Sequence, residues 1–231
     1  MNFRLVEKIE KVKNMTIEEL CEKFNCKPKE ICMGDYIAKN TRDTVCPYKV
    51  ILGYANFENS DVVSLGNLEV VYGKKLEDTV GTLTDIYGQP VYSGVNFRNS
   101  KITDIGKNLK RVYGSISLNK NITSMGSIEF LGSNLFLSNS NVTDLGNITE
   151  IDGTLNLEDD QKRCLLHSLG KLKKVRRLYI NSKCLHDLGD LEEVVELKVG
   201  SRCGQRVIEL LSDNLSKRGN KYIRKEHIAS V

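Results

Sequence analysis

The fold is decided by the stretch LSNSNVTDLGNITEIDG at residues 137–153, because close variants of it recur along the chain. FENSDVVSLGNLEVVYG occupies residues 57–73, FRNSKITDIGKNLKRVYG residues 97–114 and LNKNITSMGSIEFLG residues 118–132. A weaker copy, INSKCLHDLGDLEEV, begins at Ile180. A unit of about 20 residues cannot bury its own apolar face, so the copies must stack on one another as a solenoid.

Composition agrees with a stacked aliphatic core. The chain has 231 residues, of which 40% are hydrophobic, with six Phe, nine Tyr and no Trp, and its net charge is +4. No stretch approaches the roughly 18 apolar residues that a transmembrane helix needs. Charged residues run throughout residues 1–20, which leaves no secretory signal. We therefore expect a cytoplasmic protein without membrane contact.

Residues 1–47 lack the repeat and are expected to form a helical N-terminal cap. The pattern predicts one amphipathic helix over residues 4–13 and a second that begins at a capping box of Thr16 and Glu19. Pro28 can then open a short third helix through Cys32. The segment is similar to a helix-turn-helix unit, so DNA binding stays open as an alternative to the cap.

The repeats predict a solenoid over residues 48–204. The 40-residue gap after Gly66 is interpreted as a degenerate unit, TLTDIYG, that ends at Gly88, followed by an inserted loop. A second insertion is expected in EDDQKRC, at residues 158–164. Residues 205–231 are expected to form a C-terminal helical cap that ends at Gly219, followed by a loosely held basic tail.

The repeated unit, x-L-x-L-x-N-S-x-I-T-x-L-G, resembles leucine-rich repeats, in particular the short, about 20-residue type of bacterial and phage proteins. The resemblance implies an α/β or mainly β fold, with one parallel strand per repeat and a leucine-rich-repeat-like solenoid. The Asn that bonds backbone in such turns is mostly replaced by Ser60, Ser100 and Ser140, with Asn121 as an exception. Their hydroxyl groups can still form a polar ladder.

Residues beside the buried Leu-type positions of each strand are expected to point outward and form a partner-binding surface. This surface is polar and contains two aromatic residues, a composition that binding hot spots favour. Its predicted members are Asn96, Arg98, Ser117, Asn119, Phe136, Ser138, Asn156, Glu158, Tyr179, Asn181 and Lys198.

A basic cluster, KLKKVRR at residues 171–177, offers a second type of surface. Its charges are expected to fan outward, where nucleic acid could dock on Lys173, Lys174, Arg176 and Arg177. A solubilising surface is the more common role of such clusters.

Motifs for catalysis are absent from the sequence. There is no H-E-x-x-H, G-x-S-x-G or P-loop phrase, and the three histidines are far apart in sequence. Cys164, Cys184 and Cys203 are one repeat apart, which predicts a column of packed thiols rather than a metal site. We therefore expect that the protein is not an enzyme and that it binds no cofactor, metal ion or small-molecule substrate.

The sequence therefore favours a non-enzymatic protein-binding module that occupies the surface of a protein or nucleoprotein target. Because the Lys-, Asn- and Ile-rich composition resembles that of AT-rich bacteria and their phages, a phage- or bacterium-encoded inhibitor or adaptor is the specific hypothesis. The alternative is a nucleic-acid-binding regulator that uses the helix-turn-helix-like segment or the basic C-terminal end.

Overall fold

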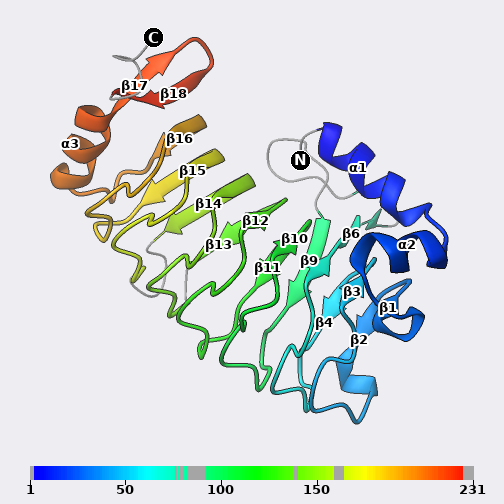
Figure 1. The fold of residues 1–231 in the computed structure, drawn as a ribbon. Helices are drawn as coiled ribbons and strands as arrows, with labels where there is room; N and C mark the ends of the chain where they lie inside the picture. Colours follow the sequence, from blue (N-terminus) through cyan, green and yellow to red (C-terminus); the bar gives the residue numbers. More distant parts are fainter. Residues whose placement is uncertain are drawn as a thin grey trace.

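Each repeat forms one rung of a parallel β-sheet, and the rungs lie side by side along an arc (Figure 1). The structure is a computed structural model that describes residues 3–75, 77–78, 81–82, 92–137, 140–158 and 164–225. Within those residues, one sheet contains sixteen strands and only three α-helices occur. The predicted solenoid with a parallel sheet is thus confirmed, and the fold is mainly β.

Most rungs contain two short strands. The first strands pair in the order β1 (Ile31–Cys32), β3 (Val50–Ile51), β5 (Val70–Val71), β10 (Arg111–Val112) and β12 (Phe130–Leu131). The second strands pair in the order β2 (Tyr36–Ile37), β4 (Ala55–Asn56), β9 (Tyr92–Asn96), β11 (Ser115–Ser117) and β13 (Leu135–Phe136). Both rows join at β14 (Glu150–Glu158), which is followed by β15 (Lys174–Asn181) and β16 (Glu193–Val199).

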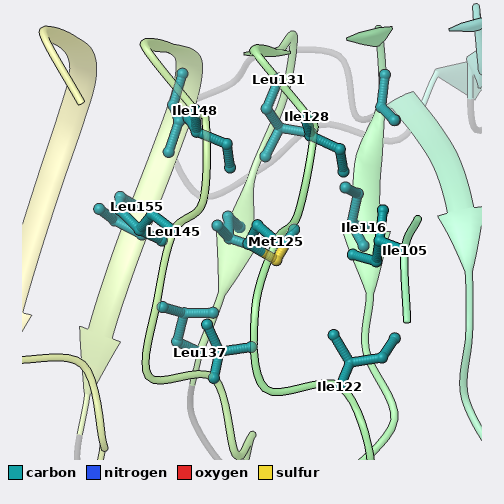
Figure 2. Close-up of a cluster of buried hydrophobic side chains, with 14 of the residues drawn as sticks. Ile105, Ile116, Ile122, Met125, Ile128, Leu131, Leu137, Leu145, Ile148 and Leu155 are labelled. Carbon is teal, nitrogen blue, oxygen red and sulfur yellow. The ribbon is translucent and has the colours of Figure 1, made fainter. Parts of the chain in front are cut away.

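Each of the two Leu positions in the predicted Leu-x-Leu strands points into the core. The same position on successive rungs therefore forms a column of aliphatic side chains. Leu135 and Leu137 are buried, and so are Leu155 and Leu157 on the next rung. Figure 2 shows Leu145 and Met125 of successive rungs next to each other, with Ile128 and Ile148 in a separate level of the same core. The core is therefore one continuous cluster built as a stack of matching layers.

A glycine with positive φ that follows an apolar residue, most often Leu, recurs in the turns of successive rungs. Gly146 and Gly189 have φ angles of 60° and 52°, a left-handed conformation in which side chains are strained. A Cβ atom on Gly189 would lie 2.1 Å from the carbonyl oxygen of Gly170 on the preceding rung. The carboxylate of Asp144 accepts a hydrogen bond from the Gly146 N–H at 2.8 Å. Glycine is therefore required here both by the turn and by the rung below.

The N-terminal segment begins with α1 (Phe3–Lys13) and α2 (Ile17–Phe24), and the capping box of Thr16 and Glu19 is present. The expected third helix is wrong. Only a 3₁₀ turn, η1 (Pro28–Glu30), follows, and the chain then enters β1 because Ile31 pairs in register with Val50. A second 3₁₀ turn, η2 (Ala38–Asn40), follows β2. The sheet thus starts within residues 1–47.

Helices α1 and α2 cover one face of the sheet. Ile9, Val12 and Leu20 form a second buried cluster with residues of the first strands and with Tyr72 and Tyr113, which directly follow β5 and β10. The Lys13 ammonium group donates a hydrogen bond to the carbonyl oxygen of Gly73 at 2.9 Å. At the other end of α1, the Leu5 side chain lies 3.1 Å from where a Cβ atom on Gly132 would be. Helix α1 therefore crosses several rungs rather than closing one end of the solenoid.

The long gap after Gly66 does not contain a further rung. β5 pairs directly with β10, with Val70 opposite Arg111, so the interpretation of a degenerate repeat between them is wrong. After β5 the chain forms β6 (Lys74–Lys75), and then β7 (Glu77–Asp78) and β8 (Gly81–Thr82), which pair with each other in a separate two-stranded sheet. β6 then pairs antiparallel with β9, where the rung resumes. Residues 83–91, including most of TLTDIYG, and residues 159–163 of the second insertion lie outside the described residues.

The C-terminal end contains the predicted helix, but it stops earlier than expected. α3 (Gln205–Asn214) buries Val207 and Leu211 and is followed by β17 (Leu215–Arg218) and β18 (Lys221–Arg224). β18 pairs antiparallel with β16, with Glu193 opposite Ile223. The expectation of a helix up to Gly219 and a loose tail after it is therefore wrong for residues 215–224, because a hairpin extends the sheet there.

Replacing Gly189 by Ala should destabilise the protein more than replacing Gly170 by Ala. Both glycines are left-handed, with φ angles of 52° and 54°, but a Cβ atom on Gly170 would meet no atom within 4 Å. We expect G170A to cost about 1 kcal/mol for the backbone alone, and G189A about 1–3 kcal/mol more because its Cβ clashes with the preceding rung. Urea unfolding of both variants measures the difference, and equal losses would contradict the proposed contact between turns.

Candidate interaction surface

A continuous row of side chains lies on the sheet face of the last rungs, away from the core. Phe136 pairs in register with Asn156, Asn156 with Tyr179, and Tyr179 with Lys198. We call these four residues the partner row. Figure 1 shows α1 and α2 beside the N-terminal strands and α3 beyond β16, with β13, β14 and β15 between them. The row begins on the second strand β13, whereas α1 and α2 pack on residues of the first strands, including Val50 and Val70.

The aromatic residues of the partner row are held in place by the strands and are partly open to solvent. Phe136 is 49% exposed at the end of β13. Tyr179 is half-buried, and the Lys198 ammonium group lies 5.4 Å from the centre of its ring, within the range of a cation–π interaction. Because neighbouring strands are about 4.8 Å apart, the two rings lie about 10 Å apart along the sheet.

Three residues that were expected to point outward are buried instead. Asn96, Asn119 and Asn181 are each only 8% exposed, so their assignment to an exposed surface is wrong. Their amides bond the backbone of the turns that follow the strands: Asn96 Oδ1 accepts the Arg98 N–H at 3.0 Å, and Asn181 Oδ1 accepts the Arg202 N–H at 2.9 Å. These amides therefore support the rungs rather than offer groups to a partner.

Asn119 shows this role most fully. Its amide group donates to the carbonyl oxygen of Ile102 at 2.7 Å and to the hydroxyl of Ser100 at 2.9 Å, both on the preceding rung. Its carbonyl oxygen accepts the N–H groups of Asn121 and Ile122. The bonding role that the sequence suggested for Asn121 therefore belongs to Asn119. Ser100 takes part in this link, whereas Ser60 and Ser140 bond carbonyl groups of their own turns.

The other predicted members differ in exposure. Arg98 is exposed, whereas Ser117 and Glu158 are half-buried beside the partner row. Ser138 lies outside the described residues. Glu158 accepts a hydrogen bond from the Asn181 amide at 3.2 Å, so it also helps to join β14 to β15. A role for any of these residues in binding stays a prediction.

The basic cluster does not form a uniformly positive face. The Lys173 ammonium lies 3.1 Å from a carboxylate oxygen of Glu192, and the Arg176 guanidinium 3.1 Å from one of Asp152. Arg177 is only 5% exposed, so the expectation that it points outward is wrong. Arg177 lies within the central strand β15, in register with Thr154 of β14 and Glu196 of β16, so side chains of both neighbouring strands flank it.

The described residues offer little nucleophilic or metal-binding chemistry of the usual kinds. Burial raises the pKa of the Cys46 thiol to about 12 and also raises the pKa of Cys32. Such thiols are protonated at neutral pH and are weak nucleophiles. Within the described part of the chain, no group of three or more His, Cys, Asp or Glu side chains could hold a metal ion. No helix among those same residues is long and apolar enough to cross a membrane.

One contact between side chains was missed because the histidines were considered singly. His167 and His186 occupy the same position of two successive repeats, directly before the Ser-Leu-Gly and Asp-Leu-Gly turns. The structure places their rings 5.3 Å apart, centre to centre. Their equal distance from the Gly of the turn is the sequence signal that predicts this contact.

Comparison with protein-family models, curated proteins and solved structures finds no match for this chain. The interpretation of the surface therefore rests on its geometry.

Replacing Asn119 by Ala should lower the free energy of unfolding by at least about 2 kcal/mol, because backbone groups in the buried turn lose their partners. Asn121 provides a matched control, since it is exposed and two residues away. Replacing Asn121 by Ala should change stability by less than about 0.5 kcal/mol. Equal effects of the two substitutions in urea unfolding would show that the Asn119 amide does not join the rungs.

Proposed function

We propose that the protein is a non-enzymatic binding module that uses the partner row to hold a protein or nucleoprotein target. The observation that carries the proposal is the exposed ring of Phe136 in register with Asn156 and Tyr179 on a rigid sheet. Large aromatic side chains that the scaffold fixes lose little conformational entropy on binding, so they contribute strongly to affinity. Asn156 and Lys198 supply polar groups beside the rings.

The finer identity belongs to the same proposal. The 20-residue period, the Leu-x-Leu strands and the bonding of Asn119 all favour membership of the leucine-rich repeats. The proposed role is that of an inhibitor or adaptor encoded by a phage or bacterium, which acts by covering a working surface of its target. All seven cysteines are free thiols, which favours the reducing environment of the cytoplasm.

Binding of nucleic acid is the weaker alternative. The helix-turn-helix-like segment has only a three-residue 3₁₀ turn where a reading helix would lie, and its apolar side chains pack on the sheet. Two of the basic residues face carboxylates, which reduces the positive potential available to phosphates. This alternative requires binding that weakens steeply with salt and with neutralisation of Lys173 and Lys174.

Replacing Phe136 and Tyr179 together by Ala should abolish capture of the partner while the fold is kept, because both side chains are at least partly exposed. Loss of two hot-spot rings typically costs about 4 kcal/mol, or roughly a thousandfold in affinity. The measurement is affinity capture from native lysate treated with nuclease, with the recovered protein then titrated against wild type and variant.

Val63→Ala is the matched control for this experiment. Val63 is 53% exposed, comparable with Phe136, but it lies in the turn region before Gly66 and outside the partner row. The control should bind the partner as wild type does. Equal binding by wild type and the double variant would remove the partner row as the binding surface. Binding that disappears with nuclease would favour the nucleic-acid alternative.

A further inference from the structure

Two half-buried cysteines lie together at the C-terminal end of α2. Cys21 is in the last turn of this helix, which ends at Asn25 with a left-handed backbone, φ 46° and ψ 61°. The Cys26 N–H then donates to the Cys21 carbonyl oxygen at 3.1 Å, and the Asn25 N–H donates to Glu22 at 3.3 Å. These two bonds define a Schellman ending, in which the side chains of the first and last residues usually touch. The turn therefore places Cys26 against Cys21.

The separation of the two residues suits a disulfide. Because the Cys26 nitrogen lies 3.1 Å from the Cys21 carbonyl oxygen, standard bond lengths keep the two Cα atoms less than about 7 Å apart. Disulfides form at Cα separations up to about this value. Burial raises the pKa of the Cys26 thiol, and the adjacent Cys21 thiol raises it further by its charge and by a side-chain hydrogen bond. The two thiols are therefore in contact before any reaction.

Small reagents can reach this pair from solvent, since both cysteines are only partly buried. A positive charge also lies beside them. The Lys49 ammonium group donates a hydrogen bond to the Asn25 carbonyl oxygen at 3.3 Å, and its charge favours the thiolate of Cys26. The thiolate is the form that attacks a disulfide. Because the pKa of Cys26 is nevertheless raised, the exchange should be slow at neutral pH and faster as the pH rises.

We propose that Cys21 and Cys26 form a reversible disulfide, so that the end of α2 is a site of oxidation by low-molecular-weight disulfides such as oxidised glutathione. The thiolate of one cysteine attacks the glutathione disulfide, which forms a mixed disulfide and releases one reduced glutathione. The thiolate of the other cysteine attacks the protein sulfur of the mixed disulfide and releases the second glutathione. The protein loses two electrons and two protons, and the two glutathione thiols gain them.

The disulfide would join the last turn of α2 to the chain that leads into η1 and β1. Leu20 and Phe24 of α2 pack in the second buried cluster, so the new bond would hold closed the end of a helix that lies on the sheet. A bond that the folded chain favours must stabilise the folded chain by the same factor. The oxidised protein should therefore unfold at a higher urea concentration than the reduced protein.

The test places the full-length, reduced protein in mixtures of reduced and oxidised glutathione, blocks the remaining thiols by alkylation and analyses a tryptic digest by mass spectrometry. Trypsin cleaves after Lys23, so the two cysteines fall in separate peptides, residues 14–23 and 24–29. We expect these peptides to be linked by a disulfide that dithiothreitol breaks. The folded protein should form the link under conditions at least about tenfold more reducing than the urea-unfolded protein needs, because the turn positions both thiols in advance.

Single variants separate the internal disulfide from simple oxidation of thiols. Cys26→Ser and Cys21→Ser should each stop at the glutathione adduct of the cysteine that remains. Cys32→Ser is the matched control, because it removes another half-buried thiol of the N-terminal segment and should leave the linked peptides unchanged. Circular dichroism verifies that each variant is folded. Glutathione adducts alone on the wild-type protein, a link from Cys21 to a different cysteine, or equal linking in folded and unfolded protein would overturn the proposal.

Discussion

Contact between the backbones of successive Leu-Gly turns sets the spacing on which the rest of this solenoid depends. Gly189 approaches the Gly170 carbonyl group so closely that no Cβ atom fits between them, and Gly146 approaches Gly126 in the same way. Once the turns are this close, the strands lie at pairing distance and the aliphatic layers meet. The hydrophobic core supplies the driving force for stacking, whereas the glycines allow the stacking to be close enough for hydrogen bonds.

Polar side chains add hydrogen bonds to the close stacking of turns that the glycines allow. Asn119 bonds two rungs through one buried amide, and Asp144 and Ser168 bond the N–H groups of glycines that have left-handed backbones. Of these residues, Asn119 is buried by its role in the turn. Helix α1 further reduces the open area by covering the sheet face of the N-terminal rungs. The partner row lies on the second strands of the later rungs, where Phe136 and Lys198 remain exposed.

The sequence predicts the parts of the fold that follow the period. The parallel sheet, the Leu-x-Leu core and the Leu-Gly turns follow from spacing alone, because stacking imposes the same environment on each copy. Asn119 and Phe136 show the limit of this reasoning. Both lie near the ends of strands and both were expected to be exposed, but only Phe136 is exposed and Asn119 is buried. Asn119 is buried between the preceding rung and its own turn, with both of which its amide forms hydrogen bonds, and this position depends on the path of the chain. The hairpin after β5 was misread for a related reason, since a count of residues cannot distinguish an extra rung from an excursion within one.

That excursion has a consequence for how the chain can change. The inserted segment follows β6 and precedes β9, and Lys74 and Ser93 of these strands are paired neighbours in antiparallel register. The entry and exit of the inserted segment are thus fixed by the rung, independently of the length of chain between them. Such a site tolerates foreign sequence, since the cost of a longer loop grows only slowly with its length. The segment between β6 and β9 is therefore a position where evolution, or an engineer, could insert a new module without changing the number of rungs.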